Sequence, residues 1–343
     1  MVTAEHPDPV ARRSRLTGRP TTIASLATYV PPRLLTNSDL EKLVDTTDEW
    51  ILQRTGIRER HVVDPGVATS DLAKEAALKA MEAAKVTPQD IGLIVVGTVT
   101  PDMMFPSTAC LVQHKIGATR AWGFDLSAAC SAFTYSLTAA SQIVAAGGVD
   151  HALVIGADVM SSIIDYKDRA TCVLFGDGAG AVVVSAAKDA GVGIIDYEHE
   201  IDGSGGPALC MPAGGSAMPP SHKTVDERLH YVKQDGQTVF KFAVRKTEEI
   251  SRRLLERNNL TPNDLALFVS HQANRRIIMS ATEKLEVPPE KVIINIERFG
   301  NTTAATIPLA LNDAVQSGRL RKGDLVMLAS VGAGFTVGSV LVR

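Results

Sequence analysis

Cys130 is the residue of this chain that is best placed to act as a nucleophile. It lies in the segment Asp125 to Phe133, where a short apolar run gives way to small residues that open a predicted helix. The first amides of a helix and the positive end of its dipole favour a thiolate over a thiol, and the thiolate is the reactive form. The alanines around Cys130 leave room for a substrate. We therefore predict covalent catalysis at Cys130.

Two later segments carry polar side chains that a nucleophilic cysteine could use. His271 and Asn274 follow an apolar run, and Asn301 lies just before another predicted helix. Each lies where a strand or loop meets a helix, and functional residues are often carried on such loops. We predict that Cys130, His271 and Asn301 meet in one pocket, as a nucleophile with two hydrogen-bonding partners.

Each of these residue types also has a structural explanation. Free cysteines are among the most buried residues, and we interpret Cys110, Cys172 and Cys210 as inert core residues. A single histidine or asparagine at a strand end is most often a cap or a buried group with its hydrogen bonds satisfied. The prediction of an active site therefore depends on the three residues together.

The composition limits the possible functions. The chain has 343 residues, of which 45% are hydrophobic and 21% charged, enough for one large domain or two fused ones. A net charge of −3 gives no general attraction to nucleic acid. The four cysteines lack the spacing of metal ligands, which argues against structural zinc. Their scatter indicates four free thiols in a reducing cytoplasm.

The N-terminal segment, residues 1–20, contains four arginines and three prolines but no apolar run. We expect a disordered tail there and no secretory signal, because the apolar stretch of a signal is missing. No apolar run elsewhere approaches the roughly 20 residues that span a bilayer. We expect a soluble protein with neither a membrane nor nucleic acid as partner.

The chain repeats a unit of helix, turn and strand at about half its length. Thr87 and Thr261 each open a Thr-Pro-x-Asp turn between an amphipathic helix and an apolar strand, and they lie 174 residues apart. The same offset relates Asp150 and Asp324, each at the start of a later apolar strand. Strands that alternate with helices predict an α/β fold with helices on both faces of each sheet.

Two such halves related by a pseudo-twofold axis would stack as a five-layer α/β/α/β/α sandwich. We place the halves at residues 21–190, with the nucleophilic cysteine, and 191–343, with the histidine and the asparagine. In this arrangement Cys130 opens a helix of the first half, and Asn301 lies just before the equivalent helix of the second. Duplication therefore gives a physical reason for residues far apart in sequence to converge.

These residues resemble the thiolase-fold β-ketoacyl-acyl carrier protein synthase III family. The resemblance rests on the Ala-Ala-Cys-Ser context of Cys130, the His-Gln-Ala-Asn motif from His271, and Gly-Asn-Thr around Asn301. It extends from about Thr21 to Arg343 and includes three further motifs, which are Asp48 to Arg60, Phe175 to Gly180 and Gly332 to Thr336.

The resemblance implies a decarboxylating condensation. Cys130 would take an acyl group from acyl-coenzyme A, and malonyl-acyl carrier protein would then lose carbon dioxide and attack the acyl-enzyme. His271 and Asn301 would hold the malonyl carbonyl, because a neutral imidazole and an amide can donate two hydrogen bonds to an enolate oxygen. The backbone amides of Cys130 and Ala333 would bind the oxyanion of the acyl-transfer step.

The resemblance also implies binding residues and partners. The coenzyme A and pantetheine site would contain Trp50, Arg54, Arg169, Gly236 and Asn274. The acyl pocket would contain Phe105, Met160, Phe175 and Phe240, with Phe105 reaching into the pocket of the partner subunit of a homodimer. The acyl carrier protein would dock on Lys241 and Arg276. No cofactor or metal is expected, since acyl-coenzyme A and the carrier protein are substrates.

Several points stay open at the level of sequence. Lys241, Arg245 and Arg252 recur near helical spacing, and they fit a solvated helix face as well as a docking surface. Val331 and Val337 stand where many family members carry aromatic residues, so the primer is open. Acetyl-coenzyme A is the default, with branched, medium-chain or aromatic primers as alternatives. The pathway, primary or secondary, and the conformation of the loop 211–222 are not predicted.

Three competing functions share parts of this pattern. A degradative thiolase usually needs a second cysteine in a glycine-rich C-terminal loop, and residues 332–338 contain none. An acyltransferase without decarboxylation could keep Cys130 and His271, although the retained Asn301 favours condensation. A non-catalytic carrier-binding subunit would be expected to lose Cys130 or His271.

Two glycine-rich segments look superficially like phosphate-binding loops. Gly176 to Gly180 and Gly332 to Gly334 are each followed by a strand-like run. A dinucleotide site needs a strand, a turn and then a helix. We therefore reject a dinucleotide site at either segment.

Overall fold

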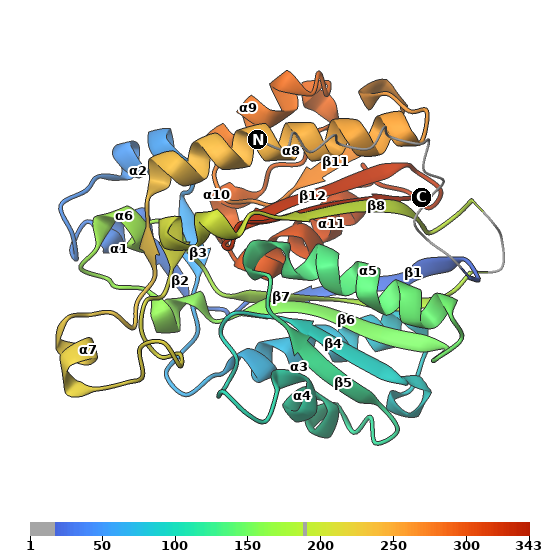
Figure 1. The fold of residues 1–343 in the computed structure, drawn as a ribbon, viewed down its shortest axis with the longest axis horizontal. Helices are drawn as coiled ribbons and strands as arrows, with labels where there is room; N and C mark the ends of the chain where they lie inside the picture. Colours follow the sequence, from blue (N-terminus) through green and yellow to red (C-terminus); the bar gives the residue numbers. More distant parts are fainter. Residues whose placement is uncertain (1–17, 188–190) are drawn as a thin grey trace, which may run out of the picture.

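The computed structural model describes residues 18–187 and 191–343, with two β-sheets at its centre. Figure 1 shows the sheets stacked with helices between them and on both outer faces. The predicted α/β/α/β/α sandwich is confirmed.

The first sheet comes from the first half of the chain. Its strand order is β1-β7-β6-β4-β5, with β4 parallel to β5 and β6, and with β7 antiparallel to β1 and β6. Its strands are β1 (Thr21–Tyr29), β4 (Leu93–Gly97), β5 (Trp122–Leu126), β6 (His151–Asp158) and β7 (Gly178–Ala186). Every residue of β4 is buried, as expected for a strand with helices on both faces.

The second sheet repeats this order with one strand fewer. Its order is β11-β12-β13-β8, in which a parallel pair is followed by two antiparallel pairs, as in β4-β6-β7-β1. Its strands are β8 (Ile194–Ile201), β11 (Leu267–Ser270), β12 (Val326–Gly332) and β13 (Thr336–Val342). An isolated parallel bridge between Phe268 and Val292 takes the place of β5.

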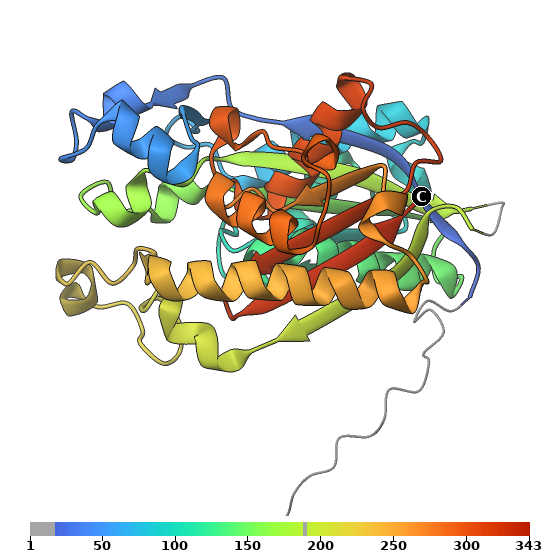
Figure 2. The same ribbon diagram turned by 90° about the horizontal axis from the view of Figure 1, so that it is seen from above.

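The long helices form three layers around the sheets. Helices α5 (Ala132–Ala145) and α11 (Thr306–Gln316) lie between the sheets, and α3 (Thr69–Ala84) and α4 (Thr108–Ile116) cover the outer face of the first sheet. Helices α8 (Gly236–Arg257) and α9 (Arg275–Lys284) cover the second sheet, and Figure 2 shows α8 lying along its strands.

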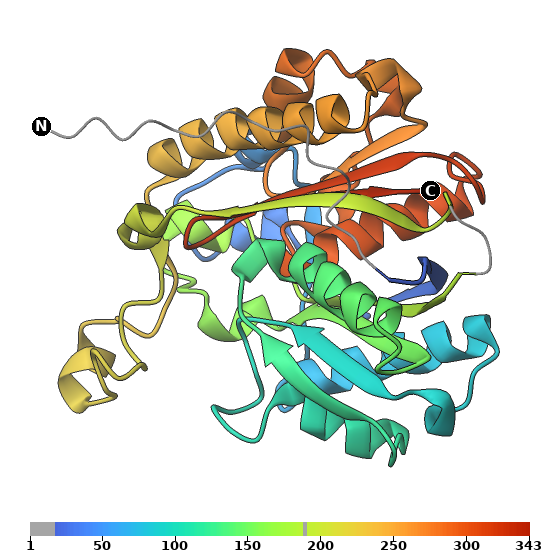
Figure 3. The same ribbon diagram turned by 45° about the vertical axis from the view of Figure 1, so that its right-hand side comes forward.

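Short elements gather at one end of the sandwich, on the left of Figure 1. They are β2 (Leu34–Thr36), α1 (Asn37–Leu40), α2 (Asp48–Thr55), β3 (Glu59–His61), α6 (Arg169–Cys172), β9 (Leu209–Cys210), α7 (His222–Asp226), β10 (Lys233–Gln234) and α10 (Ile296–Phe299). The segment around α7 extends away from the two sheets in Figure 3. It includes the loop 211–222, where the Ala213 amide donates to the Leu229 carbonyl at 3.0 Å.

The predicted repeat is visible in the turn geometry. The backbone N–H and hydroxyl of Thr87 both donate to Asp90, and those of Thr261 both donate to Asp264, at 2.6–2.7 Å. Each turn leads into a buried parallel strand, β4 or β11. The amphipathic helix expected before the second turn is α8, which begins at Gly236.

The two central helices start directly against the first sheet because glycines lie at the end of β4 and near the end of β6. A β-carbon on Gly97 would lie 2.9 Å from the β-carbon of Ala132, and one on Gly156 would lie 2.3 Å from the carbonyl oxygen of Ala304. Side chains at these two positions would push the helices away. The close approach brings the turns before α5 and α11 into the interior.

Several sequence predictions meet the structure here. Both glycine-rich segments lead into strands, β7 and β13, as predicted. All four cysteines are free thiols, as predicted. The interpretation as core residues holds for Cys172 but is wrong for Cys110, which is exposed on α4, and Cys210 is only partly buried.

The predicted disordered tail, residues 1–20, falls mostly outside the described residues. Its last three residues are described, and Arg19 is bound to the end of α5. The Arg19 backbone amide donates to Ala145, and its guanidinium donates to the carbonyls of Val144 and Val149 at 2.8 and 2.7 Å. Residues 18–20 of the expected tail are therefore ordered.

Candidate active site

Cys130 lies in a tight turn between β5 and α5. The turn Ala129–Ser131 is a single 3-10 turn, and Ala129 has a positive φ of 47°. Such a backbone conformation is uncommon for a residue other than glycine and is found at functional sites. Cys130 is 7% exposed and lines a cavity, so its sulfur is buried yet reachable.

The environment of Cys130 corrects one expectation from the sequence. Burial, with a second contribution from the negative charge of Asp158, raises the pKa of the Cys130 thiol to about 12. The predicted effect of the helix start, a depressed pKa, is therefore wrong for the resting site. The reason is that desolvation of a charged sulfur outweighs the hydrogen bond from its own backbone amide. Cys130 rests as a thiol.

His271 follows β11 directly and is held at both its backbone and its ring. Its N–H donates to the Ala329 carbonyl of β12 at 2.7 Å, and its Nδ1 atom lies 2.6 Å from the hydroxyl of Thr306. Burial lowers the pKa of His271 to about 3, so the imidazole is neutral across the physiological range. The ring therefore has one N–H and one lone pair.

Asn301 lies at the start of the turn that leads into α11. Its backbone is paired with the segment before β7, since its N–H donates to Leu174 and its carbonyl accepts from Gly176, at 2.9 and 3.1 Å. Its Oδ1 atom accepts from the backbone N–H of Thr303 at 2.9 Å. Because Oδ1 has this donor, the Nδ2 group is the part of the amide available to a ligand.

Asp158 and Thr303 connect the two halves behind these residues. Asp158, at the end of β6, is fully buried and accepts hydrogen bonds from the hydroxyls of Thr98, Thr100 and Thr303. It also accepts from the backbone amides of Val99 and Ala304 at 2.8 and 3.3 Å. Burial raises the pKa of Asp158, while these donors act in the opposite direction. The carboxyl group ties the turn before α11 to the loop after β4.

Two turns meet at the predicted oxyanion site. Ala333 follows β12, and a β-carbon on the preceding Gly332 would lie only 2.7 Å from the backbone nitrogen of Cys130. The backbone of the turn after β12 therefore packs directly on the nucleophile turn. Only a residue without a side chain fits at position 332.

A cavity of about 700 Å³ joins most of the predicted residues. Cys130, His271 and Asn301 line it together. Its wall also contains the predicted residues Trp50, Arg54, Phe175, Gly236, Phe240, Lys241, Asn274 and Arg276. The structure does not place Arg169, Ala333, Met160 or Phe105 on this wall.

Four of the five residues predicted for the coenzyme A and pantetheine site line this cavity, and the fifth is Arg169. The guanidinium of Arg169 stacks on the ring of Trp50, with 4.9 Å from its central carbon to the ring centroid. Asn274 caps α9 by accepting from the Arg276 amide, and its Nδ2 donates to the Arg54 carbonyl at 3.0 Å. Trp50 and Arg169 together present a flat cationic and aromatic surface, which suits a planar base.

The residues predicted for the acyl pocket are spread over three environments. Phe175 lines the cavity beside Asn301, whereas Met160 is 2% exposed inside a core cluster. The ring of Phe240 packs against Arg276, with 5.5 Å between the ring centroid and the guanidinium carbon. Phe105 is 84% exposed. Phe175 and Phe240 therefore line the cavity, and Phe175 also pairs with Asn301 through its backbone.

The basic residues of α8 differ in their partners. Arg245 pairs with Glu249 and Arg252 pairs with Glu248 along the helix, as on a solvated face. Lys241 and Arg276 have no acidic partner among the described residues, and both lie at the cavity wall. The two predicted docking residues, Lys241 and Arg276, are thus the ones that form no salt bridge in the described chain.

The sequence analysis missed three residues that hold the site. Thr306 binds the His271 ring, Thr303 orients Asn301 from a positive φ of 48°, and Asp158 anchors Thr303. The duplication could have pointed to them, because Thr303 and Thr306 lie 174 residues after Ala129 and Ala132, in the turn that repeats the nucleophile turn.

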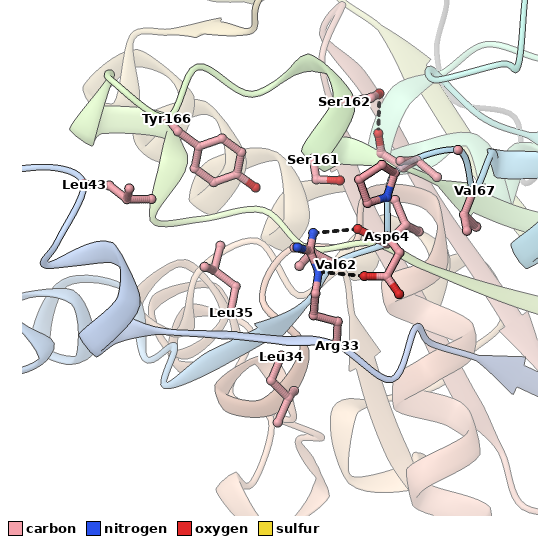
Figure 4. Close-up of a pocket in the computed structure, with 14 residues that line it drawn as sticks. Arg33, Leu34, Leu35, Leu43, Val62, Asp64, Val67, Ser161, Ser162 and Tyr166 are labelled. Atoms are coloured by element: carbon pink, nitrogen blue, oxygen red, sulfur yellow. Dashed lines mark hydrogen bonds and ion pairs between the residues drawn. The ribbon is translucent and has the colours of Figure 1, made fainter.

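A second cavity, of about 450 Å³, lies beside β2 and the segment after β3 and shares no wall residue with the first. Figure 4 shows Arg33 paired with Asp64 on its wall, with Ser161 and Tyr166 opposite. It contains no cysteine or histidine. Within the described ranges, no group of three His, Cys, Asp or Glu residues is arranged to hold a metal ion.

None of the helices in residues 18–187 and 191–343 combines the length and the apolar character that a bilayer span requires.

Comparisons with known proteins assign the sequence to one family. Residues 124–203 match the family model "3-Oxoacyl-[acyl-carrier-protein (ACP)] synthase III", and residues 255–343 match the model of its C-terminal region. The chain is 58% identical to the beta-ketoacyl-[acyl-carrier-protein] synthase III of Koribacter versatilis, over 94% of this chain and 97% of that protein.

Solved structures show the same relationship. The crystal structure of 3-oxoacyl-[acyl-carrier-protein] synthase III from Aquifex aeolicus is 42% identical, with a TM-score of 0.87 over 94% of this chain and all of that one. The priming β-ketosynthase of the R1128 polyketide pathway is 35% identical, with a TM-score of 0.88 over 96% and 98% of the two chains.

Proposed function

The chain belongs to the 3-oxoacyl-[acyl-carrier-protein] synthase III family of condensing acyltransferases, and from this premise we propose its reaction and the roles of its residues. The reaction is the condensation of an acyl-coenzyme A primer with malonyl-acyl carrier protein through an acyl-enzyme on Cys130. The supporting observation is that Cys130, His271 and Asn301, from three distant segments, line one cavity. Acetyl-coenzyme A is the default primer, and initiation of fatty acid synthesis is the corresponding role.

The first step is acyl transfer to Cys130. The sulfur attacks the acyl carbonyl carbon, the thioester bond to coenzyme A breaks, and the thiol proton leaves with coenzyme A as its thiol. Two backbone amides, those of Cys130 and Ala333, donate to the oxygen of the tetrahedral intermediate. The close packing of Gly332 against the Cys130 amide supports this pair.

The second step is decarboxylation and carbon–carbon bond formation. The malonyl carboxylate leaves as carbon dioxide, and its electron pair forms an enolate whose oxygen accepts from Asn301 Nδ2 and His271 Nε2. The enolate carbon then attacks the acyl carbonyl, and Cys130 leaves as a thiolate that takes up a proton. A neutral His271 and an Asn301 amide with Oδ1 already bonded supply donors without a competing charge.

Substrate binding is assigned to the mouth of the cavity. The adenine of coenzyme A stacks between Trp50 and Arg169, which requires the Arg169 guanidinium to move from the ring it covers. Arg54 contacts phosphate, and Gly236 and Asn274 line the pantetheine channel. The acidic carrier protein docks on Lys241 and Arg276, whose charges have no acidic partner in the described chain.

A homodimer completes the acyl pocket. The edge strand β5 has no neighbour on its outer side in the first sheet, and its first residue, Trp122, is 54% exposed. Met104 and Phe105 are 81% and 84% exposed. Unpaired strand edges and exposed apolar side chains are typical of subunit interfaces. Phe105 reaches from this surface into the pocket of the partner, towards Phe175 and Met160.

The primer is set by the cavity beyond Cys130. Val331 lies on its wall, and Val337 is buried next to it in the same apolar cluster as Phe335. Valines at these positions leave more room than aromatic residues would, so branched or larger primers are compatible with the site.

No cofactor or metal takes part in the proposed reaction, and the cytoplasm is the expected location of the protein.

The test is intact-protein mass spectrometry after exposure to a panel of acyl-coenzyme A primers, followed by a chase with malonyl-acyl carrier protein. We expect a mass gain on Cys130 that the chase releases as a β-ketoacyl product. Acylation that the malonyl carrier cannot discharge would indicate an acyltransferase without decarboxylation. A protein that no primer acylates would contradict the proposal.

Two variants separate the steps. Cys130→Ala should abolish acylation but retain some malonyl decarboxylation, because His271 and Asn301 persist. His271→Ala should still load an acyl group and then fail to condense. An acylated Cys130→Ala protein, or normal condensation by His271→Ala, would remove the residue concerned from its role.

A further inference from the structure

Among the described residues, the ring of His271 has one hydrogen-bond partner, the hydroxyl of Thr306. The Nδ1 atom lies 2.6 Å from Thr306 Oγ1, and both residues are buried. Thr306 is the first residue of α11, and His271 comes from the end of β11, so the contact joins the second sheet to a central helix. Nδ1 is held at α11, whereas Nε2 has no hydrogen-bond partner in the described chain, so Nε2 is the ring nitrogen available to a ligand in the cavity that His271 lines.

We infer that Thr306 is a positioning residue whose hydroxyl donates to Nδ1 of His271 and thereby fixes the tautomer that carries its proton on Nε2. This inference rests on the proposed condensation, in which His271 must donate to the enolate oxygen. The tautomer with the proton on Nδ1 would present a lone pair to that oxygen and repel it. One hydroxyl proton therefore decides whether the ring acts as a donor.

The other possible acceptor for that proton, the Thr303 carbonyl, lies farther away and already has one donor. Thr306 Oγ1 lies 3.0 Å from the Thr303 carbonyl, which is longer than its distance to Nδ1. The same carbonyl accepts the backbone N–H of Thr306 in the turn before α11. Nδ1, in contrast, has no other partner in the described chain. We therefore expect the Thr306 hydroxyl to donate to Nδ1 of His271 and not to the Thr303 carbonyl.

The duplication shows that the fold does not require a hydroxyl at this place. Gly97 and Ala132 lie 174 residues before His271 and Thr306, at the end of β4 and the start of α5. They are in contact as well, since a β-carbon on Gly97 would lie 2.9 Å from that of Ala132. Neither residue of the first-half pair has a polar side chain, so that contact contains no side-chain hydrogen bond. The polar pair in the second half therefore serves the site and not the packing of strand on helix.

The direct test is nitrogen NMR of protein labelled with ¹⁵N in its histidine rings, with the His271 signals assigned by comparison with His271→Gln. In the wild-type protein we expect the bonded proton on Nε2 and a bare Nδ1. In Thr306→Val, which has the same shape without the hydroxyl, the signals should change to a mixture of tautomers. A wild-type ring with its proton on Nδ1 would overturn the inference.

The kinetic test uses enzyme already acylated on Cys130, so that condensation is measured in a single turnover. Thr306→Val should lower this rate about ten- to a hundred-fold, less than the 10²–10³-fold typical when a donor is removed outright. Its acyl-loading rate should stay within about two-fold, and Thr306→Ser should restore condensation. Wild-type condensation by Thr306→Val would overturn the inference.

Thr302→Val is the matched control for the loss of a buried hydroxyl. Thr302 lies in the same turn, is fully buried, and its hydroxyl has no partner among the described residues. It should leave both the tautomer and the rate unchanged. A fall in Thr302→Val equal to that in Thr306→Val would mean that packing of the turn is responsible, and would overturn the inference.

Different results would contradict the proposed condensation and the positioning role of Thr306. If acylated wild-type enzyme does not condense with malonyl-acyl carrier protein, the proposed function fails and the kinetic role of Thr306 fails with it. The NMR experiment still reports whether the hydroxyl sets the tautomer. If condensation is normal in the wild type and in Thr306→Val, only the positioning role is lost.

Discussion

The backbone N–H of Thr303 donates to Oδ1 of Asn301 at 2.9 Å, and this bond decides which end of the amide faces a ligand. Thr303 can make it because its φ is +48°, a conformation that its hydrogen bond to the buried Asp158 helps to hold. The turn Thr303–Ala305, which leads into α11, also places Thr306 against His271. Both proposed enolate donors are therefore oriented by one turn.

Asn301→Asp should separate condensation from acyl loading. The substitution keeps the shape and the acceptor for the Thr303 amide but replaces the donor Nδ2 with a second acceptor oxygen. An enolate would then be repelled, and we expect a fall in single-turnover condensation of at least the 10²–10³-fold typical for a lost donor. Loading should change little, since Asn301 has no role in it. Equal losses in both steps would contradict the assigned role.

The pKa of Cys130, raised to about 12, predicts how its alkylation depends on pH. Because only the thiolate reacts, the rate with iodoacetamide should rise about tenfold per pH unit from 7 to 10 without a plateau. The measurement needs a Cys110→Ser background, since Cys110 is exposed. Asp158→Asn removes the charge that contributes to the shift, and it should raise the rate at each pH. A plateau near pH 8 would refute the raised pKa.

His271 should make the folded protein less stable in acid. Its folded pKa is lowered to about 3 from 6.5, so between these values the unfolded chain binds a proton that the folded ring does not. The free energy of unfolding attributable to this residue is therefore constant above pH 7. It falls as pH drops below 6.5, by at most about 1.4 kcal/mol per pH unit.

Urea unfolding at pH 7.5 and at pH 5 measures this effect, with His271→Gln as the control. The wild-type protein should lose more stability between the two pH values than the variant does, because the variant lacks the titrating ring. Parallel losses in the two proteins would mean that His271 is not the neutral, buried group described above.

The layered fold and the meeting of Cys130, His271 and Asn301 in one cavity could be predicted because each has a local signal. The two Thr-Pro-x-Asp turns and their constant offset reveal the duplication, and Cys130, His271 and Asn301 lie at junctions between regular elements. The duplication then explains why they converge, as α5 and α11 begin against the same region between the sheets.

The electrostatics of the site could not be predicted in the same way. The helix start at Cys130 is visible in the sequence, but its burial and the nearby Asp158 are not, and these two dominate the pKa. Asp158 lies 28 residues after Cys130 and acts through tertiary contacts with Thr98 and Thr303. Met160 shows the same limit, since its side chain belongs to a core cluster and not to the cavity wall.

Gly332→Ala should damage both the fold and the first chemical step. The new β-carbon would lie 2.7 Å from the Cys130 nitrogen and 3.0 Å from the Ala128 carbonyl oxygen, and neither backbone atom can move without displacing the nucleophile turn. We expect a stability loss of about 1–3 kcal/mol, as for other overpacked positions. The rate of acyl loading should fall by more than the accessibility of the Cys130 thiol. Gly215→Ala is the control, because no atom lies within 4 Å of its added carbon and it should behave as wild type. Thermal unfolding and intact-mass acylation give the two readouts, and normal loading by Gly332→Ala would show that the Cys130 amide is not part of the oxyanion site.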